Sequence, residues 1–154
     1  MMLEAAEVRR DRLVSTQASA SALSVIGALS MFSAGDRLGT IPGGWGPWTI
    51  WFQAVAVVSA VVGVAPWLSE RFSVRMQRAL VWGATCAAVA LTVATALVVD
   101  LRAPLGCQAL LTAGVVAELG TGRRALRWCW GTAAALVLIV VAYHMFVGLR
   151  PTPE

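Results

Sequence analysis

Ionisable side chains inside apolar stretches are the first candidates for chemistry in this sequence. Glu118 lies within such a stretch, shortly before Arg123 and Arg124. A charge inside a membrane is costly and often marks a functional site. Glu118 therefore has two interpretations: it reaches the interface or pairs with a nearby arginine, or it faces the interior of the helix bundle and binds a proton or ligand. We favour the first.

A second set of polar groups, Asp36, Asp100 and His144, falls near the ends of other apolar stretches. Carboxylates beside a histidine can act as general acid and base, relay protons or hold a cation. Asp36 directly precedes Arg37, and Asp100 lies two residues before Arg102. Neutralisation of each aspartate by its neighbouring arginine, on loops, is therefore the favoured interpretation. The chain has one histidine and no CxxC pair, so no metal or other cofactor is expected.

Gln53 is a further candidate for a ligand or proton path, although hydrogen bonding between helices is its default role. The sequence contains no P-loop, GxSxG, HExxH or paired-carboxylate motif. Catalysis is therefore not the favoured interpretation.

The elements that would carry these residues follow from the composition. The 154 residues are 58% hydrophobic and 13% charged, whereas soluble domains contain about 45–50% apolar and about 25% charged residues. A helix needs about 20 apolar residues to cross a bilayer. Five stretches approach this length, and the fourth, with Glu118, is the weakest; they cover about 14–34, 48–68, 79–99, 103–120 and 128–149. We predict an all-α integral membrane protein, a five-span bundle over 14–149 with a cytoplasmic arm at 1–13 and an outer tail at 150–154.

The first connector, residues 35–47, contains five glycines and two prolines. Such a composition predicts a loop that ends the first helix. Residues 33–35 also resemble a signal-peptide cleavage site. The preceding apolar stretch is about 20 residues long, which exceeds the usual range of about 7–15, so an uncleaved span is favoured.

Arginines predict the orientation. Nine of the twelve lie before the first stretch, between the second and third, or between the fourth and fifth, and the chain has no lysine. Cytoplasmic loops retain basic residues, so the N-terminus is predicted inside and the C-terminus outside. Topology and contact with anionic lipid account for the net charge of +4, and no nucleic-acid partner is expected.

Tryptophans give an independent indication of the span ends, because indole rings favour the membrane–water interface. All seven lie near a predicted boundary and are assigned as interface anchors: Trp45, Trp48, Trp51, Trp67, Trp82, Trp128 and Trp130.

Small residues at four-residue spacing predict the faces on which the helices pack, because they let backbones approach closely. These faces are Ala20, Ser24 and Ala28 in the first span, Ala84, Ala88 and Thr92 in the third, and Ala113 and Ala117 in the fourth.

Together these features suggest a small multi-pass protein of a bacterial plasma (inner) membrane. The abundant Ala, Val, Arg and Gly without Lys favour a GC-rich bacterial genome. We expect a non-catalytic accessory or assembly subunit that contacts the lipid bilayer and a membrane-protein partner or further copies of itself. Two alternatives remain: a proton-coupled transporter using Glu118 and Gln53, and an enzyme acting on a lipid or isoprenoid through Asp36, Asp100 or His144.

Overall fold

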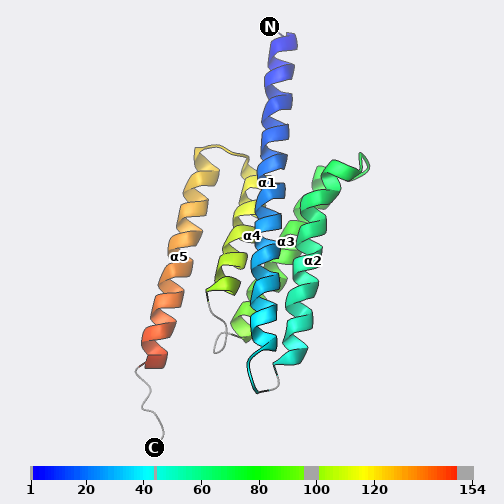
Figure 1. Ribbon diagram of the computed structural model, residues 1–154. Coiled ribbons are helices and arrows are strands. Elements are labelled where there is room, and N and C mark those ends of the chain that lie inside the picture. The colour runs from blue at the N-terminus through cyan, green and yellow to red at the C-terminus, as the bar shows by residue number, and fades with distance from the viewer. Residues whose placement is uncertain (1, 44, 96–100, 149–154) are drawn as a thin grey trace, which may run out of the picture.

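A computed structural model describes residues 2–43, 45–95 and 101–148. These residues form five helices and contain no strand. The helices are α1 (Met2–Gly39), α2 (Gly46–Leu68), α3 (Val74–Ala94), α4 (Arg102–Leu119) and α5 (Arg123–Gly148), and they run alternately up and down (Figure 1).

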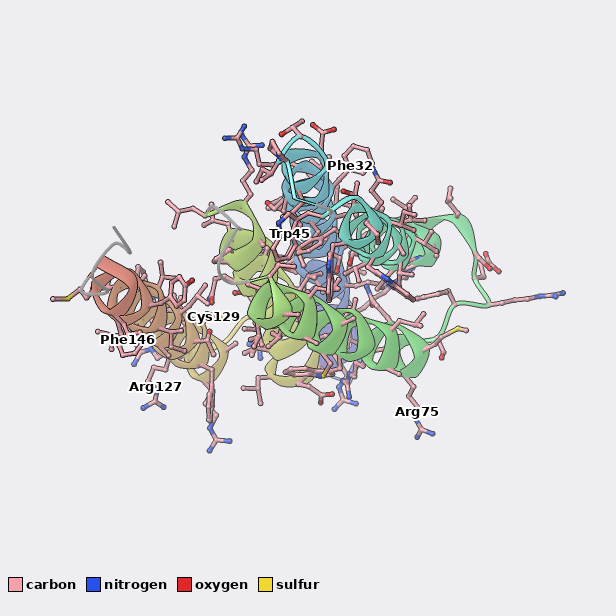
Figure 2. All side chains as sticks on the ribbon, turned by 90° about the horizontal axis from the view of Figure 1, so that it is seen from below. Phe32, Trp45, Arg75, Arg127, Cys129 and Phe146 are labelled. Carbon is pink, nitrogen blue, oxygen red and sulfur yellow. The ribbon has the colours of Figure 1, made fainter. Side chains whose placement is uncertain are left out.

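Helix α1 is the centre of the arrangement. It packs against α2 on one side and α4 on the other, while α3 contacts both α2 and α4. Helix α5 packs chiefly against α4 and stands at one edge of the molecule (Figures 1 and 2). At about 1.5 Å per residue, the 38 residues of α1 span about 57 Å. The N-terminal part of α1 therefore projects well beyond the other helices (Figure 1).

Local sequence features begin and end these helices. Pro47 lies in the first turn of α2, where its missing N–H group is not needed. Ser73 caps α3, because its side-chain oxygen accepts a hydrogen bond from the Met76 N–H. Gly120 follows α4 with a φ of 73°, a backbone conformation that favours glycine.

The prediction that residues 35–47 cannot continue the first helix was wrong for residues 35–39. Helix α1 runs through this segment to Gly39. Ala34 and Leu38 are buried there, and a Cβ atom on Gly35 would lie 2.8 Å from Phe52 Cβ. Gly35 therefore permits close packing against α2 within the helix, and the irregular turn is confined to the residues between α1 and α2.

Small residues form the contacts around α1, as the spacing predicted. Ala20, Ser24 and Ala28 are at most 5% exposed, and Ala88 and Ala113 are fully buried. The buried Ser24 hydroxyl donates to Ala20 O within its own helix, so it packs without an unpaired donor. The largest group of buried residues lies between α1, α2, α3 and α4 and includes Met31, Phe52 and Leu110.

Four helices, α1, α2, α3 and α5, are long and apolar enough to cross a membrane. Helix α4 has 18 residues and does not meet that criterion. It is also the most enclosed helix, since ten of its 18 residues are buried compared with six of 23 in α2. The other helices expose large apolar side chains, including Val61, Val93 and Leu138.

Candidate functional site

The three arginine-rich segments lie at one end of the molecule. The N-terminal part of α1, the α2–α3 turn and the α4–α5 turn all face this end (Figure 1). We call it the arginine-rich end; it carries Arg9, Arg10, Arg12, Arg71, Arg75, Arg78, Arg123, Arg124 and Arg127. The α1–α2 turn lies at the opposite end. Charge is therefore distributed asymmetrically along the helix axes.

Glu118 lies at the arginine-rich end and pairs with Arg78 of α3. The Arg78 Nη1 and Glu118 Oε2 atoms are 3.6 Å apart, and the two side chains are 40% and 43% exposed. The sequence suggested Arg123 or Arg124 as the partner; the fold brings α3 and α4 together instead. A proton- or ligand-binding role for Glu118 stays a prediction.

A buried polar network links three helices near this end. The Trp67 indole N–H donates to Ser21 Oγ at 3.1 Å, and the Gln77 amide donates to the same oxygen at 3.4 Å. Ser21 and Gln77 are 6% and 2% exposed. The network therefore fixes α1, α2 and α3 relative to one another.

The tryptophans assigned as interface anchors have different surroundings. Trp45 and Trp48 pack against the main buried cluster, with ring centroids 6.5 Å apart. The Trp82 ring covers Gly114 of α4, where an added Cβ would lie 3.1 Å from the indole. Trp67 is half exposed, and Trp51, Trp128 and Trp130 are at least 62% exposed. Anchoring at an interface stays a prediction for all seven.

The acid–base cluster expected at the opposite end is described only in part. Asp36 is exposed in the last turn of α1. Arg102, at the start of α4, donates to Ser33 Oγ at 3.1 Å and so links α4 to α1. Asp100 and the side chain of His144 lie outside the described residues. Their proximity to Asp36 stays a prediction.

Gln108 is a polar residue whose importance the sequence analysis missed. Its Nε2 atom donates to Thr132 Oγ1 at 3.2 Å and to Cys129 O at 3.3 Å, both on α5, and to Thr112 Oγ1 at 3.3 Å. Its Oε1 atom is buried without a hydrogen-bond partner among the described residues. An amide inside an apolar helix, followed four residues later by a threonine, was the available signal. Gln53, which the sequence favoured instead, is half-buried on α2.

Helix α5 is otherwise scarcely covered. Only 6% of the 18 most apolar consecutive residues of α5 are buried, compared with 44% of the corresponding residues of α1. In Figure 2, Arg127 points away from the other helices. The large exposed side chains of α5 include Trp128, Trp130, Val137, Leu138, Ile139, Val141, Met145 and Phe146.

No family model, no curated protein and no solved structure matches this chain.

Proposed function

We propose that this chain is a five-span protein of a bacterial plasma membrane that acts as a non-catalytic accessory or assembly subunit of a larger membrane complex. Its N-terminus lies in the cytoplasm and its C-terminus outside. The arginine asymmetry supports this orientation, because all nine arginines of the arginine-rich end would face the cytoplasm. Four helices have the length and composition of membrane spans.

The surroundings of α4 support a crossing of the membrane by this helix as well. Because α1, α3 and α5 enclose α4, it does not need the continuous apolar surface of a lipid-facing helix. Its antiparallel packing against α3 supports a full crossing.

The observation that carries the assembly role is the uncovered surface of α5. One side of α5 contacts α4 through Gln108, Cys129 and Thr132, and from Trp128 to Val141 its remaining sides are apolar and open. A membrane helix held on one side offers its other sides to lipid or to another protein helix. The small residues Gly131 and Ala135 on the open side favour close approach of a helix.

Extraction in mild detergent followed by native mass measurement tests this role. The chain is expected to migrate with a membrane-protein partner or with further copies of itself. Leu138→Trp on the open side of α5 should reduce that association, whereas Val93→Trp on the exposed side of α3 should leave it unchanged. A strictly monomeric protein without a co-purifying partner would contradict the proposal.

A further inference from the structure

Helix α5 begins with a concentration of positive charge that no acidic residue of the helix offsets. Arg123, Arg124 and Arg127 lie in its first two turns, and the helix contains no Asp or Glu. All three side chains are exposed, and none has an ion-pair partner among the described residues. Arg123 and Arg127 are four residues apart, a spacing at which like charges destabilise a helix. A bound anion would relieve this repulsion.

The other two arginine-rich segments differ from α5, because carboxylates accompany their arginines. The arm of α1 has three carboxylates for its three arginines: Glu4, Glu7 and Asp11. The segment from the α2–α3 turn into α3 contains Glu70, and Arg78 of α3 pairs with Glu118 of α4. The three arginines of α5 therefore account for most of the net charge of +4.

An exposed apolar stripe continues along α5 from two of these arginines. At about 100° per residue, Arg123, Arg127 and the stripe fall within about 80° of arc. The stripe consists of four exposed residues: Trp130, Ala134, Val137 and Val141. It faces away from Cys129 and Thr132, which contact α4. Figure 2 likewise shows Arg127 pointing away from the other helices.

This stripe is separate from the small residues on the open side of α5. Gly131, Ala135 and Leu138 are centred about 90° further round the helix than Arg123, Arg127 and the stripe. A ligand on the stripe therefore leaves room for a protein helix beside it.

The order of groups along α5 matches the order of groups in a phospholipid. At about 1.5 Å per residue, Trp130 lies about 5–11 Å deeper than the two arginines, and Val141 lies about 21 Å deeper than Arg127. Guanidinium groups bind phosphate oxygens through paired N–H donors. Indole rings favour the membrane interface, and apolar side chains at greater depth contact acyl chains.

We propose that an anionic phospholipid binds this face of α5, with its phosphate between Arg123 and Arg127 and an acyl chain along the stripe. A zwitterionic phospholipid offers the same phosphate but no net charge to offset the arginines, so the face selects an anionic lipid. The inference rests on the proposed crossing of the membrane by α5. It does not depend on the assembly role.

Native mass spectrometry of the delipidated protein, titrated with phosphatidylglycerol or phosphatidylcholine, tests the selectivity. Phosphatidylglycerol should bind in preference. Arg123→Gln combined with Arg127→Gln should lower the affinity for phosphatidylglycerol about 30-fold, roughly fivefold for each arginine. Affinity for phosphatidylcholine should change little. The conservative pair Arg123→Lys and Arg127→Lys keeps the charge and should keep the preference.

The matched control combines Arg71→Gln with Arg75→Gln. It removes the same charge from the same end of the molecule, at a segment that contains Glu70, and should leave the affinity for phosphatidylglycerol nearly unchanged. An equal loss in both double variants would overturn the inference, because general charge attraction would then explain the binding. Equal affinity of the unmodified protein for the two lipids would also overturn it.

Fluorescence quenching by brominated lipid locates the face. In phosphatidylcholine nanodiscs, a small fraction of brominated phosphatidylglycerol should quench tryptophan fluorescence more than the same fraction of brominated phosphatidylcholine. Trp130→Phe should remove most of this excess. Trp128→Phe is the control, because Trp128 is also exposed on α5 but lies about 160° round the helix from Trp130. An excess that persists in Trp130→Phe would contradict the proposed face.

The lipid site and the assembly role can fail separately. A monomeric protein that selects phosphatidylglycerol would support the lipid site and contradict the assembly role. A stable complex without lipid selectivity would contradict the lipid site alone. Failure of α5 to insert into the membrane would overturn both.

Discussion

Gly63 of α2 is the residue at which close helix packing is most sharply defined. A Cβ atom there would lie 2.8 Å from both Ser21 O and Val25 Cγ2 on α1. Because the backbone oxygen cannot rotate away, Gly63→Ala is expected to lower the free energy of unfolding by about 1–3 kcal/mol. Denaturation in detergent by SDS titration measures the change.

Gly83→Ala is the matched control for that substitution. Gly83 lies on the adjacent helix α3, and an added Cβ would meet nothing within 4 Å. Alanine favours helix more than glycine does, so this variant should be neutral or slightly stabilising. Equal destabilisation by both substitutions would show that contact with α1 is not the cause.

The Glu118–Arg78 ion pair is expected to add little stability. Both side chains are about two-fifths exposed and their charged atoms are 3.6 Å apart. Glu118→Gln should therefore lower the free energy of unfolding by less than about 1 kcal/mol. A double-mutant cycle with Arg78→Gln measures the coupling. If the protein drove proton-coupled flux in liposomes and folded Glu118→Gln abolished it, the transporter alternative would replace the proposed role.

For single residues, the sequence predicted which side chains are buried better than it predicted which side chains they contact. The four-residue spacing of Ala20, Ser24 and Ala28 was sufficient to predict a buried face, because helical periodicity is local. The partner of Glu118 was not predictable, since it depends on which helix lies beside α4. Gln108 was missed for the same reason, because two of the acceptors for its amide N–H groups belong to α5 and cannot be identified before α5 is known to pack against α4.

At the scale of elements, the attachment of α5 depends on a polar contact. Thr132 Oγ1 accepts a hydrogen bond from Gln108 Nε2 across the α4–α5 interface. Thr132→Val keeps the shape of the side chain and removes this acceptor. Hydrogen bonds between membrane helices average about 0.6 kcal/mol, so amide hydrogen exchange in α5 should rise about threefold.

Thr112→Val provides the comparison within one helix. Thr112 Oγ1 also accepts from Gln108 Nε2, but both residues belong to α4. This substitution should leave exchange in α5 nearly unchanged. Similar exchange rates in the two variants would exclude the interhelical bond as the cause of the attachment.

The number and order of the helices were predictable from the apolar stretches, whereas their ends were less so. Pro47 and Gly120 act locally at helix ends, and their effects can be anticipated from residue type. Gly35 shows the difficulty, because glycine disfavours helix in isolation yet here allows Phe52 to pack against α1. Tertiary contact decides between those two roles.

For the whole molecule, the decisive question is whether α4 crosses the membrane. Hydropathy alone selects four spans and omits α4. That criterion suits helices that face lipid, while α4 is enclosed by α1, α3 and α5. If α4 did not cross, the α4–α5 turn would be separated from the other arginine-rich segments, although Figure 1 places all three at one end. The positions of the arginines and the burial of α4 therefore favour the same number of spans.

Compartment-specific reporters distinguish four spans from five. Fusions within the α2–α3 turn at Arg71 and the α4–α5 turn at Thr121 should report the cytoplasm, and a fusion after the final residue should report the outside. The Arg71 fusion serves as the control, because its compartment is the same for either number of spans when the N-terminus is inside. The Thr121 and C-terminal fusions change sides together if α4 does not cross. Reporters that place both chain ends in one compartment would therefore contradict the crossing of α4.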